Sequence, residues 1–242
     1  MKALILAAGL GSRLRPLTDS RPKALVEVGG VTLLERTLRT LSDAGCSGFV
    51  VNVHHFGDQI MDFLARNRNF GLDIAISDER DLLRDTGGAI RHAAPLLRTE
   101  EKFLIHNVDI ISNLDYRGFM ARCSASAAEA SLLVSRRQTS RYLLFEEDGA
   151  LAGWTNVATG EVRSPYAESD FDVSQFRRLA FSGIHVFSSS LLEEMAQWPE
   201  KFSVIDFYLQ MCTAHRIEAV EEPQLQLADL GTPAAVAEFE KR

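Results

Sequence analysis

Short apolar runs alternate with helical patterns over the first half of the chain, and this order restricts the fold more than any other feature. The apolar runs are typical of buried strands and lie at residues 3–6, 49–53, 72–76 and 102–108. Helices are indicated at 31–44 and 57–66, and a loop at 77–86 leads through Gly87-Gly88 into a short helix that ends near Pro95. This βαβα order predicts a mostly parallel, doubly wound sheet with right-handed crossovers.

The helix expected at 31–44 carries signals at both ends. Thr32 and Glu35 have the spacing of a capping box, in which side chains satisfy backbone N–H groups of the first turn. Gly45 follows the pattern and favours a stop, because glycine readily adopts the left-handed geometry that ends helices.

The second half of the chain has a different pattern. Strands are expected at 131–135, 141–145, 150–154, 179–187 and 217–220, and helices at 191–198, 204–214 and 233–242. Residues 147–149 predict a hairpin turn, and the polar segment 156–178 is interpreted as an irregular, mobile flap. No repeat or linker divides the chain, so these pieces should cover one end of the parallel sheet and form a second wall of a cleft.

Composition excludes several classes of protein. The 242 residues carry a net charge of −7, which argues against a broad nucleic-acid-binding surface. No apolar stretch reaches the roughly 18 residues of a membrane span. The cysteines (Cys46, Cys123 and Cys212) match neither a zinc spacing nor a disulfide framework, and this favours reduced thiols in a cytoplasmic protein.

A glycine-rich turn follows the first apolar run. Gly9 and Gly11 can present backbone N–H groups to a phosphate, and Arg13, Arg15 and Lys23 supply positive charge nearby. The turn lacks the third glycine of a dinucleotide fingerprint and the Gly-Lys-Ser/Thr end of a P-loop. The pattern therefore indicates a polyphosphate site of another kind, with a nucleotide as the first candidate ligand.

Three polar segments should meet at one edge of the predicted sheet. The Gly9 turn, the turn at 85–88 and Asp109 all follow expected strands or lead into helices beside them. Ligands of doubly wound sheets bind at the carboxyl ends of the strands. The sequence therefore predicts one cleft at this edge.

Residues 6–18 (LAAGLGSRLRPLT) and 22–26 (PKALV) resemble the signature of the sugar-1-phosphate nucleotidyltransferases. The resemblance continues in the family's order through Asp85-Thr86-Gly87-Gly88, Asn107-Val108-Asp109, 181–184 and 229–233, and it is weakest at 136–178. It implies a Rossmann-like α/β fold, similar to the GT-A glycosyltransferases, with a mixed, mainly parallel sheet flanked by helices and a small antiparallel sugar-binding part. The chain would then be one domain, 1–242, with a nucleotide-binding half at 1–115 and a sugar-binding half with the last helix at 116–242.

The resemblance also implies a reaction. Members transfer a nucleoside monophosphate from a nucleoside triphosphate to a sugar 1-phosphate, giving a nucleotide-sugar and pyrophosphate. The short chain and the Thr-Gly-Gly loop are most similar to N-acetylmuramate 1-phosphate uridylyltransferases, with mannose 1-phosphate guanylyltransferases and other hexose or heptose 1-phosphate enzymes as alternatives. The base, the sugar and the oligomeric state stay open.

Residue roles follow from the resemblance alone. Arg13 would hold the triphosphate, Lys23 would bridge the α-phosphate and the incoming sugar phosphate, and Asp109 would act with Asp229 as a ligand of Mg²⁺, a hard ion that prefers oxygen. Backbone groups of Ala8, Gly9 and Gly11 would hold the nucleotide. The further substrate-binding residues would be Ser12, Glu79, Thr86, Gly87, Asn107, Ser182 and Gly183.

One position departs from the family. The family usually has Asn-Gly-Asp where this chain has Asn107-Val108-Asp109, and a valine would add a side chain beside the sugar site. The histidines His54, His55 and His106 are interpreted as packed or rim residues. Trp154, Asn156 and Tyr166 could shape a sugar pocket or simply pack.

Other functions fit less well. A glycosyltransferase would often carry Asp-x-Asp after a strand, whereas Asp109 is followed here by two isoleucines. A non-catalytic nucleotide sensor would not need Arg13, Lys23, Asp109 and Asp229 together. A Rossmann dehydrogenase would need the missing third glycine.

Overall fold

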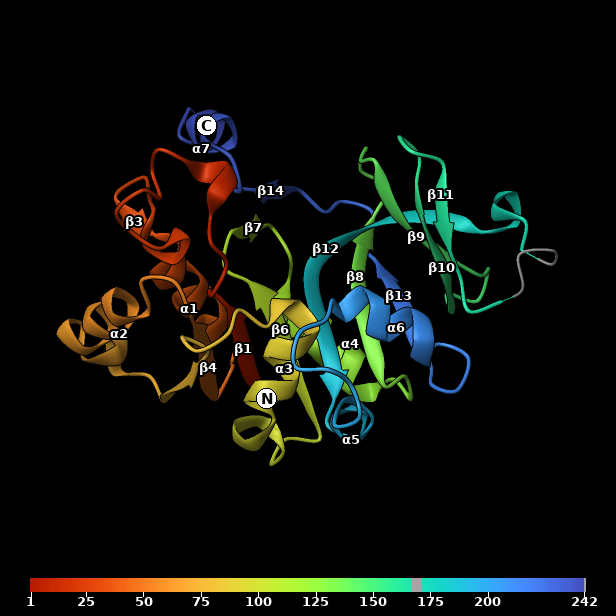
Figure 1. The fold of residues 1–242 in the computed structure, drawn as a ribbon, viewed down its shortest axis with the longest axis horizontal. Helices are drawn as coiled ribbons and strands as arrows, with labels where there is room; N and C mark the ends of the chain where they lie inside the picture. Colours follow the sequence, from red (N-terminus) through yellow and green to blue (C-terminus); the bar gives the residue numbers. More distant parts are fainter. Residues whose placement is uncertain (167–170, 242) are drawn as a thin grey trace.

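The computed structural model describes residues 1–166 and 171–241, and a mixed sheet runs through the whole of this part (Figure 1). Four parallel strands form its centre in the order β6-β1-β4-β5. They are β1 (Lys2–Leu6), β4 (Gly48–Val53), β5 (Ile74–Asp78) and β6 (Lys102–Asn107). After β1, the chain forms β4 and then β5 on one side of β1, and it then crosses over to form β6 on the other side. The strand order therefore reverses between β1 and β6.

The long strand β12 (Arg177–Ser188) joins the parallel strands to the antiparallel half. It pairs antiparallel with β6 on one side and with β8 and β9 on the other. The remaining strands of this sheet are β8 (Ala130–Ser135), β9 (Arg141–Phe145), β10 (Leu151–Asn156), β11 (Glu161–Arg163) and β13 (Ile217–Glu221). Two small sheets pair β2 (Glu27–Val28) with β3 (Val31–Thr32) and β7 (Ile110–Ser112) with β14 (Leu227–Asp229).

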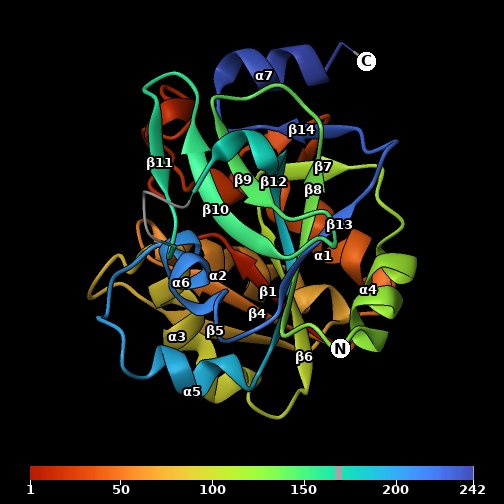
Figure 2. The same ribbon diagram turned by 90° about the vertical axis from the view of Figure 1, so that its right-hand side faces the viewer.

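Helices cover both faces of the sheet (Figure 2). They are α1 (Leu33–Asp43), α2 (Gly57–Arg66), α3 (Asp85–Leu97), α4 (Tyr116–Ala125), α5 (Leu191–Met195), α6 (Val204–Met211) and α7 (Pro233–Phe239). Alternate residues of β1 face opposite ways, so Ala3 and Ile5 pack with α1 and α4 while Leu4 packs with α3 and α6. This double burial explains why the strand is apolar from Ala3 to Leu6. The predicted fold class is confirmed.

The helix predictions were accurate where local signals were strong. α2 has the predicted bounds, and α1 begins at Leu33, after Thr32, whose side chain accepts a hydrogen bond from the Glu35 N–H at 3.2 Å. The start predicted at Val31 was wrong, because Val31 and Thr32 pair with β2. Gly45 ends the helix with a φ of +100°.

The predicted end near Pro95 was also wrong. α3 begins at Asp85 and passes through Pro95 to Leu97. A proline in the last turn removes one backbone hydrogen bond, and the helix still closes through the Arg98 N–H to Ala94 at 3.0 Å. The predicted loop at 77–86 is shorter too, since β5 continues to Asp78.

Other boundaries in the second half need correction. α5 and α6 end at Met195 and Met211, short of the predicted 198 and 214, because the chain turns after each through hydrogen bonds of the i+3 type. The segment 156–178 is not irregular throughout, since β11 forms a hairpin with β10 and β12 begins at Arg177. The last helix, α7, ends at Phe239 and not at the predicted Arg242. Part of the predicted flap, residues 167–170, lies outside the described residues, as does Arg242 itself.

Within the described residues, no helix is both long enough and apolar enough to cross a membrane.

Candidate functional site

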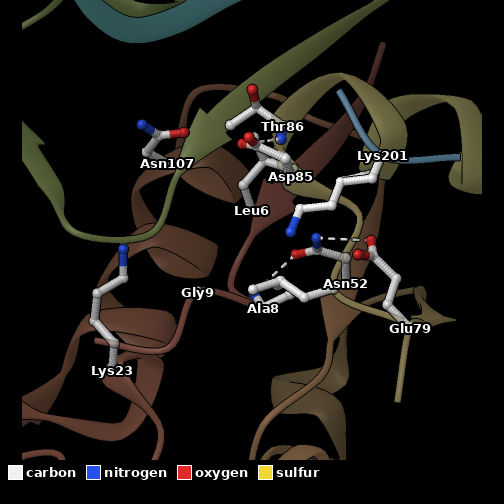
Figure 3. Close-up of a pocket in the computed structure, with 12 residues that line it drawn as sticks. Leu6, Ala8, Gly9, Lys23, Asn52, Glu79, Asp85, Thr86, Asn107 and Lys201 are labelled. Carbon is white, nitrogen blue, oxygen red and sulfur yellow. Dashed lines mark hydrogen bonds between the residues drawn. The ribbon is translucent and has the colours of Figure 1, made fainter. Parts of the chain in front are cut away.

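A cavity of about 380 Å³ opens where the strand order reverses between β1 and β6 (Figure 3). Leu6 and Asn107, the last residues of these two strands, both line it. The other two parallel strands contribute Asn52, near the end of β4, and Glu79, which follows β5. Ligands of open α/β sheets bind at such a reversal point, so the position fits the cleft predicted from the sequence.

Lys23 and Asp109 meet at one side of this cavity. The Lys23 Nζ lies 3.0 Å from the Asp109 Oδ2, and both side chains are largely buried, with 16% and 7% exposure. Gly9 lies against the lysine, since a β-carbon placed on Gly9 would be 3.7 Å from the Nζ. The buried carboxylate of Asp109 is thus compensated by a positive charge at the mouth of the glycine-rich turn.

Arg13 and Asp229 converge on Gly231. A β-carbon at Gly231 would lie 2.7 Å from the Arg13 Nη2 and 2.8 Å from the Asp229 Oδ1, so a larger residue would displace one of these two groups. Asp229 also accepts a hydrogen bond from the Gly231 N–H at 2.9 Å. The next residue, Leu230, donates its N–H to the backbone carbonyl of Asp109 at 2.9 Å. The structure therefore brings Arg13, Lys23, Asp109 and Asp229 into one region.

Asn52 connects the glycine-rich turn to Glu79. Its Oδ1 accepts the N–H groups of Ala7 at 2.6 Å and Ala8 at 3.1 Å, and its Nδ2 donates to the Glu79 Oε1 at 2.9 Å. The Glu79 Oε2 is buried without a hydrogen-bond partner among the described residues, and burial raises the pKa of this carboxyl. Because the Ala8 N–H is already bonded, Ala8 can offer a nucleotide only its carbonyl oxygen and methyl group.

The first turn of α3 contains both cavity-lining and packing residues. Asp85 and Thr86 line the cavity, and Asp85 holds a φ of +60°, which is rare outside glycine. Gly87 packs elsewhere, since its N–H donates to the carbonyl of Phe202 at 2.9 Å. A β-carbon on Gly87 would lie 2.3 Å from the Phe202 ring, so this glycine is needed for close packing.

Gly183 and Ser182 also have structural partners. Gly183 has a φ of +76°, and a β-carbon there would lie 2.5 Å from the Asn107 Nδ2. The Ser182 hydroxyl is buried and donates to the carbonyl of Leu133 at 2.8 Å. Gly11 has a φ of +63° and its carbonyl accepts the Thr18 hydroxyl at 2.8 Å, while the neighbouring Ser12 is exposed.

The expectation that Val108 would place a side chain beside the sugar site was wrong. Its side chain is 1% exposed and belongs to the apolar core with Ile110 and Leu230, and the residue does not line the cavity. The interpretation of His106 as a packed residue is confirmed, because its ring is bonded to the Tyr116 hydroxyl and the Asn107 carbonyl, each at 2.8 Å. Burial lowers the pKa of His106 to about 4.

Sequence reasoning missed two polar residues of the cavity, Asn52 and Lys201, besides the apolar Leu83 and Ala89. Asn52 is a polar residue in an otherwise apolar buried strand, and this was a usable signal of a bonded or functional side chain. Lys201 reaches the cavity from the loop before α6, and no local pattern predicts that approach (Figure 3). Among the described residues, no group of three or more His, Cys, Asp or Glu side chains could hold a metal ion.

Comparison with known proteins gives a consistent result. A family model described as nucleotidyl transferase matches residues 2–240. An N-acetylmuramate alpha-1-phosphate uridylyltransferase of Caulobacter vibrioides is 32% identical over 99% of this chain and 96% of its own length. A mannose-1-phosphate guanylyltransferase catalytic subunit beta of Drosophila pseudoobscura pseudoobscura is 27% identical over 82% of this chain and 51% of its own.

A solved structure supports the fold. A putative glucose-1-phosphate thymidylyltransferase from Bacillus anthracis superposes with a TM-score of 0.80 and 17% identity, covering 100% of this chain and 94% of its own. The relatives named above are sugar-1-phosphate nucleotidyltransferases, as the sequence resemblance predicted. Since the family model spans nearly the whole chain, this protein belongs to the nucleotidyl transferase family.

Proposed function

We propose that this protein transfers UMP from UTP to N-acetylmuramate 1-phosphate and releases pyrophosphate. The choice of substrates rests on the uridylyltransferase relative that matches 99% of the chain. The proposed reaction is supported by one observation above all: the Lys23 Nζ lies 3.0 Å from the Asp109 Oδ2, beside the glycine-rich turn. Mannose 1-phosphate with GTP is the second candidate, because a guanylyltransferase matches 82% of the chain.

The reaction needs an attack in line on one phosphorus atom. A phosphate oxygen of the sugar 1-phosphate forms a bond to the α-phosphorus of the nucleotide, and the bond from that phosphorus to the bridging oxygen of pyrophosphate breaks. The nucleophile is already an anion, so no general base is required. In this proposal, Lys23 offsets the negative charge on the two phosphates that approach each other, and Arg13 binds the departing pyrophosphate.

The carboxylates would serve as metal ligands. Mg²⁺ binds through few protein carboxylates together with waters and substrate phosphates, and Asp109 and Asp229 supply two carboxylates in one region. The fit is supported by the Asp109 carboxylate, which is 5% exposed as a residue and already has a cationic partner. When bound, Mg²⁺ would withdraw charge from the reacting phosphate.

The base would lie beside Glu79 and Thr86, with Asn107 toward the sugar, as the resemblance implied. We assign residues 1–115 to nucleotide binding and 116–242 to sugar binding, with Lys201 as a contribution of the second half to the first. The three cysteines are free, and this favours a reaction in the cytoplasm. Ser12, Gly11, Gly87, Ser182 and Gly183 would act through the backbone that they shape.

The test is an assay of pyrophosphate release. The protein is mixed with Mg²⁺, each of the four ribonucleoside triphosphates or dTTP, and a panel of sugar 1-phosphates. We expect release with UTP and N-acetylmuramate 1-phosphate, and none after removal of Mg²⁺ by EDTA. Release with GTP and mannose 1-phosphate alone would transfer the proposal to the second candidate, and no release with any pair would refute both.

Two substitutions test the assigned roles. Lys23→Ala and Asp109→Asn should each lower kcat by about 10²-fold or more, because each removes charge stabilisation at the reacting phosphate. Circular dichroism and thermal unfolding verify that the variants stay folded. Arg66→Ala serves as a control, since this side chain is 80% exposed on α2. Unchanged turnover in both test variants would contradict the roles.

A further inference from the structure

A second cavity, of about 540 Å³, lies in the antiparallel half of the molecule. The loop before α6 contributes to both cavities, since Lys201 lines the first and Ser203 the second. β12 gives an indirect connection: Phe181 lines the second cavity, and Gly183, two residues further on, packs against Asn107, which lines the first. The two cavities are therefore close to each other along these two segments.

The second cavity is rich in arginine. Arg137, Arg141 and Arg163 line it together with Trp154, whereas its one acidic lining residue is Glu161, counted over the residues that the structure describes. An excess of positive charge thus faces a space of the size of a sugar.

Within residues 1–166 and 171–241, only Arg163 of these three arginines has a carboxylate partner. Arg163 forms an ion pair with Asp206, and its guanidinium lies 4.1 Å from the centre of the Trp154 ring. Arg137 donates one N–H to the backbone carbonyl of Phe181 at 3.0 Å and pairs with no described carboxylate. The side chain of Arg141 has no hydrogen-bond or ion-pair partner in the described part of the chain.

The position of Arg141 is fixed by strand pairing. It lies directly opposite Asn156 in the β9–β10 ladder, and Leu143 lies opposite Trp154 two positions along. All four of these residues line the second cavity. The backbone of Arg141 is therefore fixed in the wall of the second cavity. Its guanidinium, which pairs with no described residue, can bind a carboxylate through two parallel hydrogen bonds.

We infer that the second cavity binds the sugar and that Arg141, assisted by Arg137, selects a sugar that carries a carboxylate. The inference rests on the proposed function, in which N-acetylmuramate 1-phosphate carries a lactyl carboxylate and N-acetylglucosamine 1-phosphate does not. The 1-phosphate of the sugar must reach Lys23 to react. The anion left for Arg141 is therefore the carboxylate.

Kinetics with two matched substrates tests the inference. The kcat/KM values are measured with UTP for N-acetylmuramate 1-phosphate and for N-acetylglucosamine 1-phosphate. Arg141→Gln should lower kcat/KM for the acidic sugar about 10- to 100-fold, mainly through KM, because it removes a charge-assisted hydrogen bond. The value for the neutral sugar should change by less than about twofold, and Arg66→Gln, a matched arginine change on α2, should alter neither.

Two results would overturn the inference. An equal loss for both sugars would make Arg141 a general support of the site, and a wild-type enzyme without preference for the acidic sugar would exclude selection by charge. Calorimetry separates this inference from the proposed function, by titrating free N-acetylmuramate and N-acetylglucosamine into wild type and Arg141→Gln without turnover. Binding of the acid that depends on Arg141, with no pyrophosphate release from any pair, would refute the proposed function alone. Turnover without any effect of Arg141 would refute the inference alone.

Discussion

We expect Asn52 to contribute to the free energy of unfolding and to its dependence on pH. The residue is only 3% exposed, and its side-chain amide forms three hydrogen bonds. Its oxygen accepts the N–H groups of Ala7 and Ala8, and its nitrogen donates to Glu79. These contacts connect the ends of β1 and β4 with the residue after β5. Two substitutions separate the acceptor role from the donor role.

Asn52→Ala removes all three hydrogen bonds. The N–H groups of Ala7 and Ala8 lose their acceptor, and the Glu79 Oε1 loses the Asn52 amide as its donor. Each buried group left without a partner costs about 1–3 kcal/mol, and water from the adjoining cavity will keep the values near the lower end. We expect a loss of about 3 kcal/mol. For a chain of this length that lowers Tm by about 6–12 °C.

Asn52→Asp keeps the acceptor and removes the donor. It places a second carboxyl beside Glu79, whose pKa is already raised by burial, and two neighbouring carboxylates raise it further. A carboxyl with a raised pKa in the folded state stabilises below its unfolded pKa of about 4.3, and the contribution is lost as pH rises through the folded value. The variant should therefore lose more stability than wild type between pH 5 and pH 8.

Thermal unfolding at pH 5, 6.5 and 8 checks both variants. The double variant Asn52→Asp with Glu79→Gln should lose the additional pH dependence, because the second titrating carboxyl is gone. If Asn52→Asp follows the wild-type profile at every pH, or if Asn52→Ala loses less than about 1 kcal/mol, the network does not have the role assigned to it.

Three further predictions concern the packing of Gly88, the role of Lys201 and two buried histidines. Gly88→Ala should lower Tm, because a β-carbon there would lie 2.2 Å from the carbonyl oxygen of Glu200. It should also raise KM for the nucleotide, because Glu200 precedes Lys201, which lines the first cavity. An unchanged Tm would contradict the packing argument. Lys201→Ala should raise KM for UTP about 10-fold with kcat nearly unchanged, and an effect on kcat alone would be inconsistent with a binding role. Stability should fall as pH falls from 6.5 toward 4, because burial lowers the pKa of His106 to about 4 and that of His185 to about 3. Chemical unfolding at pH 7 and pH 5 measures this loss of stability. The loss should be smaller in His185→Phe.

Local signals predicted the elements that are stabilised locally. The bounds of α2 and the cap of α1 were predicted because a single apolar face and a Thr32–Glu35 cap are local properties. The start of α3 was missed because Asp85 adopts a left-handed backbone that no local pattern indicates. β11 was missed because it is short and largely exposed, with charged residues on both sides of Val162, so only pairing with β10 makes it a strand.

The same distinction applies to the candidate site. The motif residues Arg13, Lys23, Asp109 and Asp229 could be assigned from the resemblance, and the fold brings them together. Lys201 could not be assigned, since it enters the cavity only when the loop before α6 packs on α3 through Phe202. Arg141 became a candidate only when β9 and β10 were seen to form a wall of the second cavity.

Strand β12 passes close to both cavities, through Phe181 at the second and through the contact of Gly183 with Asn107 at the first. β12 pairs with β9 over residues 177–179 and with β6 over residues 184–188, and its pairing with β8 shifts register between Phe181 and His185. Gly183 lies within this irregularity, with a φ of +76°, and the Asn107 side chain packs against it. A side chain at this position would displace Asn107 from the first cavity and alter the turn that directs Phe181 to the second. Transfer between bound substrates is sensitive to shifts of about 1 Å, so under the proposed function we expect Gly183→Ala to lower kcat, and an unchanged kcat would contradict this reasoning.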